Sequence, residues 1–483
     1  MSLKQKTING LFWSFIDSTA NQGIQFIFGI ILARLLSPRE FGLIGMLTVF
    51  IAISQSFIDS GFGNALIRKQ NCTNSDYSTV FYFNLFISFV VYLILFFCAD
   101  FISVFFQEPE LALLLRVLSI GLIFNAIGII QSTILTKNID FKKQTRISII
   151  SSLLSGTVSI IMALNGFGVW SLVALTLCRF GFNSLFLWVW ATWKPSLIFS
   201  KTSFTEMFSF GSKLLVSGLI NTVFENVYYL IIGKYFSSVQ LGYYTRADQF
   251  KMLPSIGITG VISRVSYPVL SSVQNDILLL NAGYKKLIKT TMFITFLLMI
   301  GMAAVAKPMI IVLIGEKWIV AAEYLQLLCF VGMFYPLHAL NLNMLQVQGR
   351  SDLFLKLEII KKILAVPTIL IGVFFGIKPM IIAMIINTII AYYLNSYWSG
   401  KFINYSFGGQ VKDLLPSFLI SSTIGVAVFF VGYFLQASQL IILLLQISLG
   451  AFLTFVLCEL FKLSEYVYIK EIVFEKIFLR NHE

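Results

Sequence analysis

Apolar residues dominate this chain in long runs that short polar or Gly- and Pro-containing breaks separate. Each run suits the roughly 20 residues that an α-helix needs to cross the hydrocarbon core of a bilayer. The alternating polar and apolar pattern of a membrane β-barrel is absent, so helices are the spanning elements. The sequence therefore predicts an all-α integral membrane protein with about 14 transmembrane helices. They are expected at residues 11–36, 41–65, 79–99, 111–135, 146–165, 168–190, 211–233, 247–271, 288–306, 319–346, 357–376, 378–399, 413–434 and 439–461.

A polar stripe on the first apolar run recurs on the seventh. The first stripe comprises Asp17, Asn21 and Gln25, and the second comprises Ser217, Asn221 and Glu225. Residues four apart share one face of a helix, so each run presents a polar face along an otherwise apolar helix. The loops that follow also match, with Ser237 and Gly242 in the places of Ser37 and Gly42. We interpret the two segments as copies of one helix–loop–helix unit.

This duplication predicts how the chain is divided. One six-helix bundle is expected at residues 1–205 and a pseudo-symmetric second bundle at 206–402, followed by two further helices and a tail at 403–483. Each half holds an even number of spans, so both copies enter the membrane from the same side, as in a parallel repeat. Chance similarity between two apolar sequences is the alternative explanation.

Composition supports membrane insertion, and charge predicts orientation. The 483 residues are 58% hydrophobic and only 12% charged, whereas a soluble domain is about 25% charged. The net charge of +13 does not point to nucleic acid, because most Lys and Arg residues fall in the tails and the connections on the same side. A minority, including Arg39, Lys234 and Lys251, fall on the opposite side. Basic connections face the cytoplasm, so we expect both termini there and the protein in the bacterial cytoplasmic membrane.

Ionisable residues inside the apolar runs are the first candidates for function. Such groups cost about 2.5–3.5 kcal/mol at a helix centre and usually face a bundle interior or an aqueous cavity. Arg179 and Arg264 suit a phosphate or pyrophosphate group, which a guanidinium binds bidentately. Asp17, Asp59 and Glu225 are candidates for coupling to a proton or sodium ion. An interfacial position is the alternative for Arg264.

Neutral polar residues on the same faces suit the hydroxyl groups of sugars. The cavity candidates of this kind are Asn21, Gln25, Asn221 and His338. For His338 the alternative is a histidine satisfied within the protein core.

Sequence motifs of several enzyme and pump classes are missing. The chain has no GxxxxGK[ST] sequence for ATP, and neither HExxH nor GxSxG. Its five cysteines are scattered without a CxxC pair. We therefore expect no cofactor, no metal site and no catalytic residue, and we expect a transporter rather than an enzyme.

Four segments resemble the Wzx-type polysaccharide flippases of the multidrug/oligosaccharidyl-lipid/polysaccharide exporter superfamily, including colanic and teichuronic acid exporters. They are LARLLSPREFGLIGM from Leu32, SFIDSGFGNALIRK from Ser56, LGYYTRADQF from Leu241 and YPVLSSVQND from Tyr267. The resemblance implies two six-helix bundles around a central cleft plus two C-terminal helices. It also implies an undecaprenyl-pyrophosphate-linked oligosaccharide as substrate, flipped by alternating access for O-antigen, capsule or exopolysaccharide synthesis. A coupling ion, membrane lipids, a polysaccharide polymerase and glycosyltransferases are the implied partners.

Two other functions compete with this interpretation. A drug:cation antiporter of the same fold would use carboxylates rather than arginines in its cavity. A membrane glycan polymerase or ligase would need a sizeable external loop with catalytic residues, and no connection in this chain is long.

Overall fold

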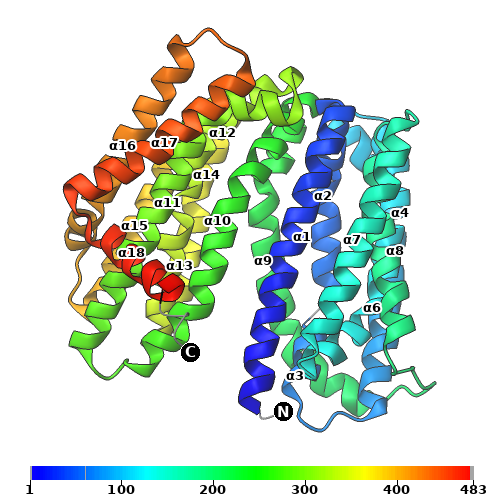
Figure 1. The fold of residues 1–483 in the computed structure, drawn as a ribbon. Helices are drawn as coiled ribbons and strands as arrows, with labels where there is room; N and C mark the ends of the chain where they lie inside the picture. Colours follow the sequence, from blue (N-terminus) through cyan, green and yellow to red (C-terminus); the bar gives the residue numbers. More distant parts are fainter. Residues whose placement is uncertain (1–2, 60, 479–483) are drawn as a thin grey trace. The chain divides into compact units, whose positions relative to one another are not determined.

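The structure, a computed structural model, describes residues 3–59 and 61–478 and is helical almost throughout (Figure 1). It contains no β-strand in these residues. The helices are α1 (Leu3–Leu35), α2 (Pro38–Asp59), α3 (Phe62–Arg68), α4 (Asn74–Phe106), α5 (Glu110–Leu118), α6 (Ile120–Lys137), α7 (Phe141–Leu164), α8 (Trp170–Trp190), α9 (Lys201–Tyr235), α10 (Ser238–Ser272), α11 (Ile277–Ile314), η1 (Glu316–Trp318), α12 (Ile319–Gly332), α13 (Tyr335–Val347), α14 (Ser351–Phe375), α15 (Ile377–Ile403), α16 (Phe407–Phe434), α17 (Gln439–Phe461) and α18 (Ser464–Phe478). The all-α prediction is confirmed.

Eleven helical segments within the described residues are long and apolar enough to cross a membrane. They overlap eleven of the predicted spans, but α9 begins 10 residues and α11 begins 11 residues before the predicted start. The remaining three predictions correspond to α1, α10 and α14, which form as helices but are not among the eleven. The count of 14 is therefore not confirmed. Charged and amide side chains within these three helices lower their hydropathy.

Contacts divide the chain into two compact units, Met1–Thr245 and Arg246–Glu483. The first unit contains α1 to α9 and the start of α10. In it, α7 packs against both α1 and α8, and the three helices run side by side in Figure 1. In the second unit α11 packs against α12, α16 and α17. The boundary expected between residues 205 and 206 separates the two duplicated halves. Contacts do not test duplication, so this boundary stays a prediction.

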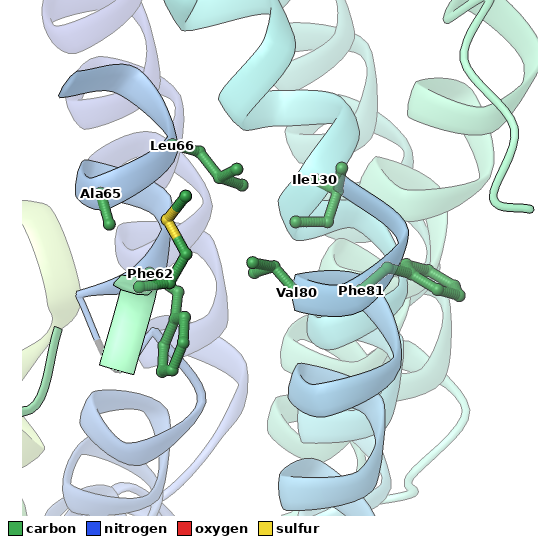
Figure 2. Close-up of a cluster of buried hydrophobic side chains, with 7 residues drawn as sticks. Phe62, Ala65, Leu66, Val80, Phe81 and Ile130 are labelled. Atoms are coloured by element: carbon green, nitrogen blue, oxygen red, sulfur yellow. The ribbon is translucent and has the colours of Figure 1, made fainter. Parts of the chain in front are cut away.

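A buried apolar cluster in the first unit joins α3, α4, α6 and α9 (Figure 2). It comprises Phe62, Ala65, Leu66, Val80, Phe81, Ile130 and Met207. The α3 members are spaced i, i+3 and i+4, so they form one face of this short helix. Burial of that face leaves the other side of α3 available to line a cavity.

Each of the repeated loops places a serine directly before the second helix of its copy. Leu35 ends α1 and Pro38 starts α2, and 200 residues later Tyr235 ends α9 and Ser238 starts α10. Both the amide and the hydroxyl group of Ser37 donate to the Glu40 carboxylate, at 2.6 and 2.9 Å. The Ser237 hydroxyl oxygen accepts a hydrogen bond from the backbone N–H of Gln240 at 3.2 Å. Ser237 therefore caps α10 by accepting a backbone N–H, whereas Ser37 is held at the start of α2 by the Glu40 side chain.

The two copies contact each other through reciprocal glycines. A Cβ atom added to Gly42 would overlap the carbonyl oxygen of Ser238, and one added to Gly242 would overlap the carbonyl oxygen of Pro38. The starts of α2 and α10 thus approach each other closely in backbone-to-backbone contact, which only glycine permits.

Replacing Gly42 by alanine is expected to destabilise the first unit by about 2 kcal/mol, because the new methyl group meets rigid backbone rather than a movable side chain. The thermal midpoint of the purified protein should fall. Gly23→Ala is the matched control: this α1 glycine has nothing within 4 Å of an added Cβ, so alanine should be neutral or stabilising. Equal midpoints for the two variants would contradict the close approach.

Candidate functional site

The polar stripe of α1 is bonded to α7. Asn21 Nδ2 donates to Asp17 Oδ1 and to Ser148 Oγ, both at 2.9 Å. Ser148 Oγ also donates to Asp17 Oδ1, and Ser152 Oγ donates to Asn21 Oδ1 at 2.8 Å. Hydrogen bonds between polar side chains hold apolar helices together where little hydrophobic force acts between them. Asp17 and Asn21 therefore fix α1 against α7.

One turn further along α1, Gln25 of the same stripe contacts Arg179 on α8. The amide group of Gln25 lies 2.9 Å from both terminal nitrogens of the guanidinium, and with its oxygen turned toward them it accepts two hydrogen bonds. Both side chains remain exposed. Asp17 adds an electrostatic attraction to Arg179. Among the described residues, no carboxylate forms a salt bridge with Arg179.

This arrangement gives Arg179 the properties of an anion-binding group. A guanidinium has five N–H donors in a fixed fork, so donors remain after the contact with Gln25. Because a neutral amide and not a carboxylate orients it, its charge stays available to a ligand. Phosphate and pyrophosphate oxygens match this donor geometry.

Asp59 lies apart from that group but in the same unit. It is the last residue of α2 and lines a cavity of about 370 Å³ between α2, α3, α6 and α8. The cavity is lined largely by uncharged oxygen-bearing side chains.

The remaining candidates lie on other helices. Asn221 and Glu225 are exposed on α9, whose neighbouring Thr222 exchanges a 2.9 Å hydrogen bond with Ser56 of α2. Arg264 lies on α10, and its side chain is outside the described residues. In the second unit, His338 Nδ1 lies 3.1 Å from Asn395 Nδ2.

The second unit contains a buried ion pair, Asp248 with Lys251, that was not predicted from the sequence. Lys251 is 1% exposed and Asp248 4% exposed, and Lys251 Nζ donates to Asp248 Oδ1. Lys251 Nζ also lies 3.4 Å from Tyr335 Oη and 5.2 Å from the centre of that ring. Lys251 falls within the predicted span 247–271 but was counted with the basic residues outside the membrane, which is wrong: it lies inside α10, enclosed by neighbouring helices. The i, i+3 spacing of the pair was the available signal.

More than half of the chain matches the model of a known protein family. The model of the family described as "Polysaccharide biosynthesis protein" matches residues 31–323. The chain belongs to this family. The matched range begins near the end of α1 and contains both repeated loops, Asp59, Arg179 and the buried Lys251 pair.

Several relatives of this chain have names that point to surface glycans. The chain is 27% identical over 408 residues to "Lipopolysaccharide biosynthesis protein WzxC" of Escherichia coli (strain K12), covering 82% of each chain. It is 26% identical over 354 residues to "Teichuronic acid biosynthesis protein TuaB" of Bacillus subtilis (strain 168), covering 73% of each. "Succinoglycan biosynthesis transport protein ExoT" of Rhizobium meliloti (strain 1021) is 27% identical over 319 residues, with 65% of this chain and 64% of that one covered. The Wzx-type resemblance is confirmed.

Two solved structures share the fold of this family member. "Lipid II flippase MurJ, inward closed conformation" superimposes with a TM-score of 0.75 at 16% identity, over 96% of this chain and 100% of that one. An inward-facing multidrug resistance MATE family transporter gives a TM-score of 0.64 at 17% identity, over 79% of this chain and 94% of that one. At these identities the likeness shows the fold alone.

Proposed function

We propose that this protein flips a lipid-linked oligosaccharide across the membrane for the synthesis of a surface polysaccharide. One observation carries the proposal: an exposed guanidinium, Arg179, lies within an apolar helix and is oriented by the neutral amide of Gln25. Relatives named for lipopolysaccharide, teichuronic acid and succinoglycan biosynthesis support a glycan substrate. A flippase of lipid II among the proteins of the same fold supports the type of transport.

The substrate is an oligosaccharide on undecaprenyl pyrophosphate. Arg179 binds the pyrophosphate, and a role for Arg264 as a second cationic group stays a prediction from the sequence. The exposed amides of Gln25 and Asn221 accept or donate hydrogen bonds to sugar hydroxyls, while Asn21 holds the stripe in place and His338 contributes from the second unit. The lipid tail stays among the membrane lipids, which avoids the cost of exposing it to water.

Translocation follows an alternating-access cycle in the bacterial cytoplasmic membrane, with both chain termini in the cytoplasm. The duplicated bundles at residues 1–205 and 206–402 form the two halves, and residues 403–483 add two helices. A proton or sodium ion drives the cycle through one of the carboxylates Asp17, Asp59 or Glu225. Glycosyltransferases supply the substrate and a polymerase consumes it.

Reconstitution into liposomes tests this function. A fluorescently labelled undecaprenyl-pyrophosphate oligosaccharide should become accessible to a membrane-impermeant glycosidase faster in liposomes that contain the protein than in empty ones. Ion-gradient-driven efflux of a cationic dye, without glycan flipping, would instead support the antiporter, which the MATE-like fold makes the second candidate. Flipping rates equal to those of empty liposomes would overturn the proposal.

A further inference from the structure

We propose that a cavity in the second unit binds the headgroup of an anionic glycerophospholipid such as phosphatidylglycerol. The cavity has a volume of about 430 Å³ and lies between α11, α12, α16 and α17. All four helices belong to segments that are long and apolar enough to cross a membrane. The inference goes beyond the proposed function and does not depend on it, because a bilayer lipid would occupy this cavity whether or not the protein flips a glycan.

The four helices pack together and leave this space near one end of the bundle that they form. Helix α11 contacts the other three, and α16 contacts α17, to which a short connection joins it (Figure 1). Phe429, Gly432 and Tyr433 from the end of α16 line the cavity, and so does Gln439, the first residue of α17. A bilayer has its headgroups at the level of helix ends. The cavity is therefore at the depth of a lipid headgroup rather than among acyl chains.

A buried glutamine gives the cavity a polar wall with one unpaired atom. Gln446 of α17 lines the cavity and is 1% exposed. Its Nε2 donates to the Val428 carbonyl of α16 at 2.9 Å, whereas its Oε1 is buried without a hydrogen-bond partner in the described part of the chain. A buried acceptor without a donor is unfavourable. A hydroxyl group of a ligand in the cavity supplies the missing donor.

Gly432 holds this glutamine against α16. A Cβ atom at position 432 would overlap Gln446 Nε2, so only glycine lets the amide group reach the backbone of α16. The amide is thus fixed by its bond to Val428, and Oε1 is the atom that it leaves for a ligand. This arrangement is a built polar site inside helices that are otherwise apolar.

Lys307 gives the cavity a positive charge that no described residue neutralises. Its side chain is exposed, lines the cavity and forms no salt bridge within the described residues. It lies about two turns before Ile314, where α11 ends. The acidic residue of the lining, Glu323, is already paired with Lys378 at 2.8 Å. A cation at this depth extends to the headgroups or takes an anionic partner, and a lipid phosphate provides both.

Two helix N-termini add to the positive field. Helix α12 begins at Ile319 and α17 at Gln439, and both residues line the cavity. Ser438, which precedes α17, forms no capping hydrogen bond with its side chain, so the first amide groups of α17 are not used by a cap. Helix N-termini favour anions. Together with Lys307 they select a phosphate group.

Neutral side chains indicate the rest of the headgroup. Gln326 and Gln439 line the cavity and form no side-chain hydrogen bond within the described residues, and Gln446 lacks a donor. Amides both donate and accept, which suits the glycerol hydroxyls of phosphatidylglycerol. The ammonium group of phosphatidylethanolamine would need a free carboxylate, but Glu323 is bound to Lys378. An anionic headgroup with hydroxyls therefore fits better than a zwitterionic one.

Exposed aromatic side chains connect the cavity with the surrounding bilayer. Phe429 is 43% exposed and Tyr433 72% exposed, and both line the cavity. Tyrosine is enriched at the headgroup level of membrane proteins because its ring is apolar and its hydroxyl polar. Acyl chains can pack against these rings while the headgroup enters. A water-soluble phosphate has no such apolar part, so a lipid is the better occupant.

Lipid binding can be measured on the purified, delipidated full-length protein in detergent, from its thermal midpoint. Phosphatidylglycerol should raise the midpoint in a saturable manner, whereas phosphatidylethanolamine and inorganic phosphate should have little effect. Lys307→Gln should raise the half-saturating concentration of phosphatidylglycerol by about tenfold, because a charge-assisted bond to the phosphate is lost. Lys356→Gln, which removes an exposed lysine of α14 in the same unit, should behave as the wild type.

Gln446→Met tests the buried amide separately. Methionine keeps most of the side-chain volume and removes the unpaired oxygen, so the variant should fold without lipid. Its half-saturating concentration of phosphatidylglycerol should rise by about fivefold. A glutamine with a purely structural role would instead change the midpoint without lipid and leave the lipid dependence unchanged, which would contradict its place in the site.

Three results would overturn the proposal as a whole. The first is the same dependence on phosphatidylglycerol in the wild type, Lys307→Gln and Gln446→Met. The second is an equal effect of phosphatidylglycerol and inorganic phosphate on the wild type, which would leave an anion site without a lipid. The third is a rise with undecaprenyl pyrophosphate that exceeds the rise with phosphatidylglycerol and is lost in Lys307→Gln, which would assign the cavity to the transported lipid.

Discussion

Arg179→Ala is expected to reduce flipping of the lipid-linked oligosaccharide by about 100-fold. Removing one partner of a desolvated, charge-assisted contact costs about 3 kcal/mol, and each 1.4 kcal/mol is about tenfold. The fold should survive, because Arg179 is exposed and its only hydrogen-bonding contact on α1 is a neutral amide. The measurement is the initial flipping rate in liposomes, normalised to the amount of reconstituted protein.

Two further variants separate anion recognition from positive charge alone. Arg179→Lys keeps the charge but loses the planar fork, so its flipping rate should fall between those of the wild type and Arg179→Ala. Arg39→Ala is the control: this partly exposed arginine forms salt bridges with Glu108 and Glu110 at 2.8 and 3.3 Å, and such pairs contribute about 0–1 kcal/mol. Wild-type flipping by Arg179→Ala at normal protein levels would remove the residue from the substrate site.

Much of the helical framework could be predicted from the sequence because hydropathy and helix length report directly on insertion into a bilayer. The same reasoning was weaker for α1, α10 and α14, because their polar residues lower the mean hydropathy toward that of a loop. The stripe of Asp17, Asn21 and Gln25 was visible because every fourth residue is polar. Its partners Ser148 and Ser152 could not be found in this way, because they come from a helix more than 120 residues away.

Two features were not predicted from the sequence, and the reasons differ. The polar face of α6 from Asn125 to Thr136 has the same helical periodicity as the α1 stripe, but it carries no charge, and the search began from charged residues. The buried Lys251 was counted with the basic residues outside the membrane because lysines near the ends of spans usually extend toward water. Only the packing of α11, α12 and α13 around this part of α10 reveals that it is enclosed.

Lys251→Met is expected to cause the largest loss of stability among substitutions in the second unit. Methionine keeps most of the aliphatic volume of lysine but leaves Asp248 buried without this cation, which costs about 3–5 kcal/mol. For a unit of this size the apparent thermal midpoint should fall by roughly 10 °C. The purified protein in detergent, followed by tryptophan fluorescence during heating, gives the measurement.

The double variant Asp248→Asn/Lys251→Met shows whether the cost comes from the uncompensated charge. With the carboxylate replaced by a neutral amide, most of the lost stability should return, since the two substitutions act on one ion pair and are not additive. Lys378→Met is the matched control, because Lys378 pairs with Glu323 at 2.8 Å with both side chains about half exposed. Its thermal midpoint should change little. If the double variant were as unstable as the sum of its single substitutions, the pair would not act as a unit, and the loss would have to come from packing around α10.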